Sequence, residues 1–197
     1  NLIKVAITGS SGKTTTKELV VSVLKQKYNV VYTQGNFNSE TGLPLSVFKI
    51  RKEHEVGVFE MGMNRQDEIG EISKVLKPEY AIITNIGSAH IGMLGSRDNI
   101  AIEKKKAFTY VSKTGAVFIP AEDEYCNFLQ KDVLGKVVLF GENVPSEISH
   151  VKYLKDCGLD GSVFCLDGIQ INLKIPGIYN YRNALASIAL AKELDLT

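Results

Sequence analysis

The clearest chemical signal in the sequence is a glycine-rich segment between a β-rich run and a helical pattern. Residues 3–8 are β-rich and lead through Gly9-Ser10-Ser11-Gly12-Lys13-Thr14 directly into the helical pattern. In this context backbone N–H groups and the positive end of a helix cradle phosphates. We expect Lys13 to contact the β- and γ-phosphates of a nucleotide and the Thr14 hydroxyl to reach Mg²⁺. The full motif has one more glycine, where this chain has Ile7, so the loop is a shortened variant.

Two further side chains follow apolar runs that read as strands. Glu60 ends the run that starts at residue 56, and His90 lies in the loop after residues 80–86. Ligands of open parallel sheets bind beyond the carboxyl ends of the strands, so both side chains would face the nucleotide. A carboxylate there can hold Mg²⁺. A lone histidine is more often structural, and position alone makes His90 a candidate ligand.

Lys104 interrupts an apolar helical stripe, whereas Lys105 and Lys106 point away from it. The stripe has a period of 3.6 residues, and its members are Ile100, Ala101, Ala107, Phe108 and Val111. A lysine on a buried face is costly unless it is paired or neutralised. The residues alone leave three outcomes open: a carboxylate partner, snorkelling to a cleft, or reaction of the neutral amine with CO₂. The resulting carbamate would be an anion suited to a second Mg²⁺.

Alternating strands and helices must position these residues. Short apolar runs alternate with amphipathic stretches, which predicts an α/β fold: a mostly parallel sheet with helices on both faces. We expect strands at residues 2–8, 30–33, 56–61, 80–86, 116–119 and 136–140, and helices at 13–27, 42–50, 67–76, 96–111 and 122–130. The dipeptide Asp167-Gly168 predicts a hairpin of residues 162–166 and 169–175, a small antiparallel edge near the C-terminus. Residues 179–194 read as a closing helix.

The composition favours a single globular domain over residues 1–197 with a small-molecule partner. Lysine and arginine number 23 against 22 acids, so there is no broad basic field for nucleic acid or a membrane surface. The three cysteines lack metal-site spacing. No apolar run approaches the roughly 20 residues of a membrane span, and no signal peptide pattern opens the chain. We therefore expect a cytoplasmic protein without disulfides.

Together, these motifs resemble the central domain of the Mur ligases, ATP-dependent enzymes that add amino acids to the peptidoglycan precursor. The segments that carry the resemblance are residues 8–16, 35–44, 60–62, 84–90 and 176–183. Within the family, Thr16-Lys17-Glu18, the Gly-Asn-Phe-Asn segment and the Glu-Met-Gly strand end resemble the branch that adds D-alanyl-D-alanine (D-Ala-D-Ala) to UDP-MurNAc-tripeptide.

The resemblance implies amide formation through an acyl phosphate, with ATP and two Mg²⁺ ions. It implies catalytic roles for Lys13, His90 and Lys104, and metal contacts by Thr14, Glu60, His90 and Lys104. Lys104 aligns with a carbamylated lysine of the family, which favours the carbamate. The implied nucleotide contacts are Gly9, Ser10, Ser11, Gly12, Lys13, Thr14 and Thr15, with Asn180 and Asn183 beside adenine. Two departures are Ile178-Tyr179 for the usual Arg-His pair and Lys105-Lys106 for Gly-Glu.

Family members also carry a UDP-sugar-binding domain before this one and an amino-acid-binding domain after it. We expect both to be absent, and the chain to be a monomer that binds nucleotide but ligates little alone. Alternatives are a Mur ligase adding a single amino acid, a folylpolyglutamate-synthase-like ligase, and a non-catalytic nucleotide-binding module. A GTPase would need an Asn-Lys-x-Asp base reader, which the sequence lacks.

Overall fold

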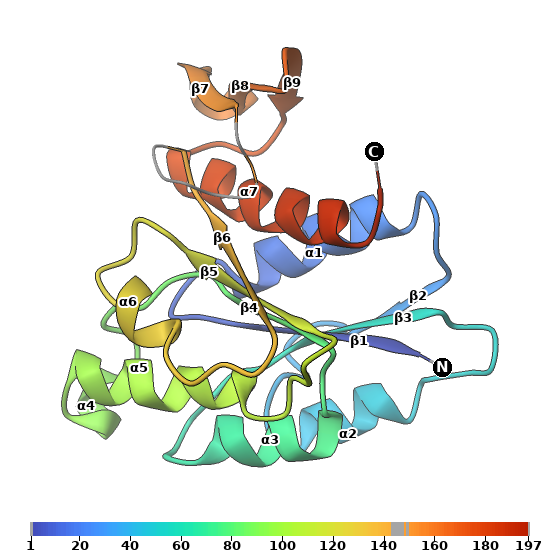
Figure 1. Cartoon of the computed structure of the whole chain (residues 1–197), viewed down its shortest axis with the longest axis vertical. Coiled ribbons are helices and arrows are strands. Elements are labelled where there is room, and N and C mark those ends of the chain that lie inside the picture. The colour runs from blue at the N-terminus through green and yellow to red at the C-terminus, as the bar shows by residue number, and fades with distance from the viewer. Residues whose placement is uncertain (1, 143–147, 149, 197) are drawn as a thin grey trace.

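The computed structural model describes residues 2–142, 148 and 150–196 (Figure 1), so residues 1 and 197 of the predicted domain lie outside it. A parallel sheet of six strands has the order β2-β3-β1-β4-β5-β6. All six predicted strands are confirmed. They are β1 (Ile3–Thr8), β2 (Val30–Tyr32), β3 (Val56–Glu60), β4 (Tyr80–Ile83), β5 (Ala116–Pro120) and β6 (Lys136–Phe140).

Helices cover both faces of this sheet, as predicted (Figure 1). One face carries α1 (Lys13–Leu24) and α7 (Ile178–Glu193), and the other carries α2 (Gly42–Val47), α3 (Glu68–Leu76), α4 (Ile91–Leu94), α5 (Arg97–Lys105) and α6 (Cys126–Leu129). Successive strand residues point to opposite faces. Accordingly, Val5 and Ile7 pack in the core under α1 and α7, whereas Ala6 packs in the opposite core.

Four predicted helices are at least three residues shorter than expected. The helix predicted at 13–27 ends at Leu24 and the one predicted at 42–50 ends at Val47. The helix predicted at 96–111 starts after Ser96, whose side chain accepts the N–H of Asn99, and it tightens after Lys105 into the 3₁₀ turn η1 (Lys106–Phe108). Only Cys126–Leu129 of the helix predicted at 122–130 is helical. The Asp123 carboxylate accepts the N–H groups of Ile86 and Tyr125, which holds the preceding residues in a turn.

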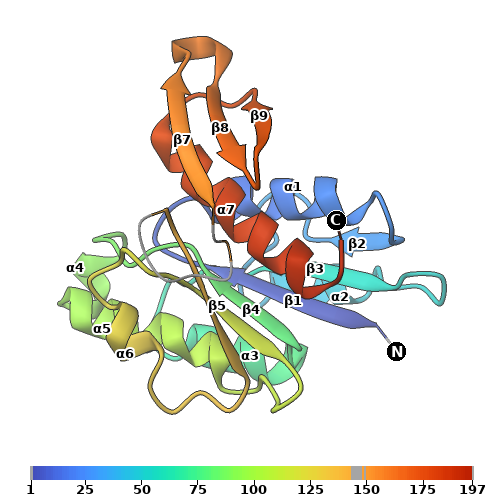
Figure 2. The ribbon, with the colours of Figure 1, turned by 45° about the horizontal axis from the view of Figure 1, so that its top comes forward.

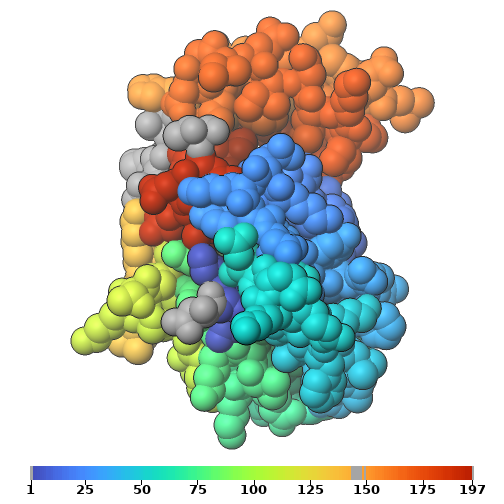
Figure 3. Space-filling view, turned by 90° about the vertical axis from the view of Figure 1, so that its right-hand side faces the viewer, coloured from blue at the N-terminus to red at the C-terminus, as the bar shows by residue number. Residues whose placement is uncertain are grey.

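The antiparallel hairpin is confirmed, but it belongs to a separate sheet rather than to an edge of the parallel one. Asp167 and Gly168 both have positive φ, as a type I′ turn requires. The sheet consists of β7 (Val151–Asp156), β8 (Ser162–Leu166) and β9 (Ile169–Leu173), with η2 (Gly158–Asp160) after β7. It stands at one end of the molecule beside α7 (Figures 2 and 3). The rings of Tyr153 and Phe164 pack on Tyr181 of α7, at centroid distances of 4.9 and 5.1 Å.

The strand order brings three loops together at one edge of the sheet. The chain leaves β1, adds β2 and β3 on one side, and then crosses to β4 on the other side. Ile7 of β1 pairs with Glu60 of β3, and Thr8 pairs with Ile83 of β4. Crevices at such reversals of strand order bind ligands in open α/β sheets. Within the described ranges, no helix is long and apolar enough to cross a membrane.

Candidate functional site

The loop between β1 and α1 has the geometry of a phosphate cradle. Gly9 and Gly12 have φ angles of 151° and 77°. A Cβ on Gly9 would lie 1.8 Å from Thr84 Oγ1, and one on Gly12 would lie 2.5 Å from Asn183 Oδ1. Both positions favour glycine, because their φ angles lie in the region that other residues rarely adopt and, at Gly9, because Thr84 leaves no room for a side chain. Lys13 Nζ donates to the carbonyl of Gly9 at 2.9 Å, so the ammonium lies over the loop.

The loop after β4 fixes the cradle from the other side. Asn85 Oδ1 accepts the N–H of Ser11 at 3.2 Å, and Asn85 Nδ2 donates to the Ser11 carbonyl at 3.0 Å. Thr84 Oγ1 donates to the same carbonyl at 2.6 Å, and Ser10 Oγ accepts the N–H of Gly87 at 2.9 Å. The sequence interpretation gave Thr84 and Asn85 no site role. The only signal was their place in the segment before His90.

Thr14 and Glu60 lie side by side at the edge of the cradle. Thr14 Oγ1 donates to Glu60 Oε2 at 2.9 Å, and Asn38 Nδ2 donates to the other carboxylate oxygen at 2.8 Å. The Glu60 residue is only 2% exposed. Asn38 is a further residue that the sequence interpretation left without a role. These contacts bring together two of the four predicted metal ligands through oxygen atoms, which Mg²⁺ prefers.

Lys104 lies beneath the cradle, 1% exposed, in the predicted apolar stripe. Its Nζ donates to the Gly9 carbonyl at 3.0 Å, the same oxygen that accepts from Lys13. Burial, and to a lesser extent the positive charge of Lys13, lower the pKa of Lys104 to about 7, against the opposing effect of Glu103. Burial also lowers the pKa of Lys13, against the nearby Glu60 carboxylate. In the part of the chain that is described, Lys104 bonds to a backbone oxygen rather than to a carboxylate.

His90 stands at the start of α4 with a φ of 69°. Burial lowers the pKa of its imidazole, and the positive charges of Lys104 and then Lys13 lower it further. These effects outweigh the opposing charge of Glu68, so the neutral imidazole is favoured. Among the described residues, no three histidine, cysteine, aspartate or glutamate side chains form a metal-binding group.

A cavity of about 530 Å³ opens beside the cradle, between the loops after β4 and β5 and the start of α7. Ser11 and Gly12 of the cradle and Thr15 of α1 line it together with Asn180 and Asn183 of α7. Asn183 Nδ2 donates to Asn180 Oδ1 at 3.1 Å, so the two amides face the cavity as a pair. Three of the predicted phosphate-loop residues and both predicted adenine residues thus line one cavity. Tyr179, one of the two departures, also lines it.

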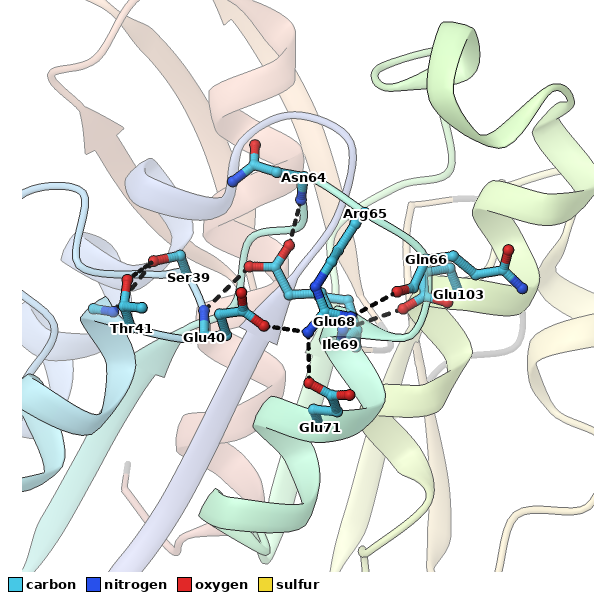
Figure 4. A network of polar contacts seen from close by, with 11 residues as sticks. Ser39, Glu40, Thr41, Asn64, Arg65, Gln66, Glu68, Ile69, Glu71 and Glu103 are labelled. Atoms are coloured by element: carbon cyan, nitrogen blue, oxygen red, sulfur yellow. Dashed lines mark hydrogen bonds and ion pairs between the residues drawn. The ribbon is translucent and has the colours of Figure 1, made fainter.

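A second polar network braces the segments around this site (Figure 4). The Glu68 residue is 2% exposed, and its carboxylate accepts the N–H groups of Glu40 and Asn64. Arg65 bonds to the carboxylates of Glu40 and Glu71. The buried Glu103, next to Lys104 in sequence, accepts the N–H of Ile69 at 3.1 Å. These contacts tie the segment of Asn38 and the helix of Lys104 to the start of α3.

Residues 7–191 match the family described as Mur ligase middle domain. The UDP-N-acetylmuramoyl-tripeptide–D-alanyl-D-alanine ligase of Treponema pallidum is 46% identical over 198 residues, which cover 99% of this chain and 42% of that protein. A crystal structure of MurF from Acinetobacter baumannii is similar at a TM-score of 0.91 and 32% identity, over 100% of this chain and 44% of that one.

A structure of MurF ligase from Thermotoga maritima in complex with ADP is similar at a TM-score of 0.82 and 30% identity. The similarity covers 99% of this chain and 46% of that one. The chain thus spans less than half the length of the relatives that it matches. The matched residues 7–191 run from the phosphate loop to the closing helix α7. The chain belongs to the Mur ligase family, as its middle domain.

Proposed function

We propose that this chain binds Mg–ATP as the nucleotide domain of a ligase that joins D-Ala-D-Ala to UDP-MurNAc-tripeptide. The observation that carries the proposal is the contact of Thr14 with Glu60 at 2.9 Å, directly after Lys13 and at the edge of the glycine cradle. The relatives named above carry this activity in their names. The MurF of Thermotoga maritima was solved with ADP, which agrees with a nucleotide at this loop.

The Thr14–Glu60 pair suits a Mg²⁺ ion. Mg²⁺ takes octahedral oxygen ligands at about 2.1 Å, so neighbouring ligand oxygens lie roughly 3.0 Å apart. The two side-chain oxygens are 2.9 Å apart, and the Asn38 amide holds the carboxylate in place. When bound, the metal would neutralise phosphate charge and orient the reacting groups. Thr14 and Glu60 would hold it.

Lys104 is the proposed site of a carbamate, which with His90 would hold a second Mg²⁺. Only a neutral amine attacks CO₂, forming an N–C bond and releasing one proton, and a pKa of about 7 leaves about half of the Lys104 side chains neutral at pH 7. The imidazole of His90 is also mostly neutral there. An NMR spectrum of the chain under ¹³CO₂ tests this step. A carbamate carbon signal in the wild type that Lys104→Met removes is the expected result, and its absence would contradict the proposal.

In the reaction, these residues would bind and stabilise charge. We expect Lys13 to leave the Gly9 carbonyl for the terminal phosphates, where it and the start of α1 stabilise charge on the phosphoryl group in transfer. The tripeptide carboxylate attacks the γ-phosphorus of ATP, giving an acyl phosphate and ADP. The amine of D-Ala-D-Ala then attacks the acyl carbon, releasing phosphate and a proton. This sequence needs no protein nucleophile.

A chimera tests the assignment. This chain would replace the corresponding segment of the Treponema pallidum ligase, which is 46% identical. We expect ADP release that depends on both UDP-MurNAc-tripeptide and D-Ala-D-Ala, and that Lys13→Ala in the same chimera abolishes. ADP release that a single amino acid or a folate substrate supports equally well would contradict the proposed substrates.

A cytoplasmic location is part of the proposal. All three cysteines, Cys126, Cys157 and Cys165, are free, which agrees with a reducing compartment. The monomeric state and the single-domain extent of the chain stay predictions. Size-exclusion chromatography with light scattering would test the first of them.

A further inference from the structure

Lys17 is a buried cation without a role in the site described above. It lies one helical turn after Lys13 on α1 and is 1% exposed. Its Nζ donates to the carbonyl of Thr33 at 2.9 Å and lies 2.9 Å from Glu18 Oε1. Glu18 is 56% exposed, so this ion pair is largely solvated. Removing an ammonium from water is costly unless it is hydrogen-bonded, and the Thr33 carbonyl is the buried partner that compensates.

Thr33 connects this ammonium to Glu60. It follows β2, is fully buried, and its N–H donates to the Val58 carbonyl at 3.0 Å. Its hydroxyl oxygen accepts the N–H of Glu60 at 3.2 Å. Thr33 thus contacts α1 through its carbonyl and β3 through its hydroxyl. Thr33 is therefore one of the groups that hold the Glu60 backbone, together with the pairing of Glu60 with Ile7 of β1.

The segment that starts at Thr33 also contacts the carboxylate of Glu60. Gly35 turns the chain with a φ of 55°, and Asn38 then donates to Glu60 Oε1. The carbonyl of Asn38 accepts the N–H of Gly62 at 2.7 Å. Residues 33–38 are therefore fixed by Lys17 at their first residue and by the end of β3 at their last. This one segment therefore contacts Glu60 at both its backbone and its side chain, in addition to the contacts of Glu60 with β1 and Thr14.

We propose that Lys17 is a positioning residue for the Mg²⁺ site at Thr14 and Glu60. This inference rests on the proposed function. The ammonium fixes Thr33, and Thr33 fixes the Glu60 backbone and the segment that presents Asn38. Without the ammonium, a buried carbonyl loses its partner and residues 33–38 must shift to find another. Glu60 then faces Thr14 less often, and the oxygens that would receive the metal are less well preorganised.

The test is the Mg²⁺ dependence of nucleotide binding to the purified chain. Lys17→Met keeps the length of the side chain and removes its charge. We expect it to weaken ADP binding in Mg²⁺ by about tenfold, the effect typical of losing a supporting partner of a metal ligand. ADP affinity in EDTA should change less than about twofold, because the cradle itself is untouched. In metal-free protein, hydrogen exchange at the Gly62 amide should accelerate, since its acceptor is the Asn38 carbonyl.

Two control variants and one independent substitution test whether the effect comes from the contact between Lys17 and Thr33. Lys25→Met removes a different lysine, at the end of α1, whose Nζ lies 4.7 Å from the centroid of the Tyr32 ring. Glu18→Gln removes the charge of the solvated carboxylate that pairs with Lys17. Both should keep wild-type Mg²⁺ dependence. Thr33→Val deletes the hydroxyl acceptor of Glu60 and keeps the carbonyl, so it should reproduce the effect of Lys17→Met. In the double variant with Lys17→Met and Thr33→Val, the loss of ADP affinity in Mg²⁺ should be smaller than the sum of the losses in the two single variants.

The outcomes separate this inference from the proposed function. A folded Lys17→Met or Thr33→Val chain with wild-type Mg²⁺ dependence would overturn the role of Lys17. If Lys17→Met does not fold, the Thr33→Val result decides alone. A wild-type chain that binds no nucleotide at all would instead refute the proposed function.

Discussion

Replacing Lys104 with methionine should stabilise the folded chain, and by an amount that depends on pH. The side chain is 1% exposed, and burial is the first cause that lowers its pKa from 10.5 to about 7. The unfolded chain exposes the amine, which then holds its proton up to about pH 10.5. Folding therefore buries an ammonium below pH 7 or strips it of its proton above that pH, and both cost free energy.

The magnitude follows from the two pKa values. At about 1.4 kcal/mol per pH unit, the gap between 10.5 and about 7 corresponds to roughly 5 kcal/mol. Between these pH values the unfolded state binds more protons, so the wild-type free energy of unfolding rises with pH. Lys104→Met lacks this contribution. The advantage of the variant should be complete below pH 7 and should shrink by about 1.4 kcal/mol per pH unit above it.

Urea unfolding followed by circular dichroism from about pH 6 to pH 9.5 measures this difference. The buffers must be free of CO₂, because a carbamate on Lys104 would add a further state of the wild type. Lys113→Met, which replaces an exposed lysine, is the control and should show a difference independent of pH. A stability difference between Lys104→Met and the wild type that stays constant across this range would refute the assignment of Lys104 as a buried amine with a lowered pKa.

Three further predictions concern the cradle and its neighbours. Gly9→Ala should abolish nucleotide binding and lower the free energy of unfolding by more than about 2 kcal/mol, because the methyl group meets a hydroxyl at 1.8 Å. Gly92→Ala, with open space around it, should change stability by less than about 0.5 kcal/mol. Glu60→Gln should remove the Mg²⁺ dependence of ADP affinity in calorimetry, and a retained dependence would exclude Glu60 as a ligand. An NMR titration of His90 should give a midpoint below 6.5 that rises in Lys104→Met, and an unchanged midpoint would mean that Lys104 does not act on it.

Local patterns were enough to predict where the cradle, Glu60 and His90 lie and that Lys104 is buried. The cradle, Glu60 and His90 follow parallel strands, and loops after neighbouring parallel strands meet at one edge of a sheet. The burial of Lys104 follows from helical periodicity, which depends only on residues one or two turns away. Each of these predictions needs no knowledge of which strand lies next to which.

Contacts between distant segments could not be predicted in this way. Asn85 bonds to Ser11 across 74 residues, and Asn38 bonds to Glu60 across 22. In the sequence, both asparagines look like ordinary loop residues, because only the strand order brings their loops next to their partners. Strand β7 was missed because it has the lysines Lys152 and Lys155 among its residues and little apolar alternation. Its pairing with β8 makes it a strand.

The central claim is that the cradle and Lys13 bind the terminal phosphates of a nucleotide. Calorimetric titration of the wild type and Lys13→Met with Mg–ATP and with AMP tests it most directly. Loss of a charged hydrogen bond predicts roughly a tenfold or larger loss of Mg–ATP affinity in the variant, with AMP affinity unchanged because AMP lacks the β- and γ-phosphates. Equal Mg–ATP affinities for the wild type and the variant would contradict the claim.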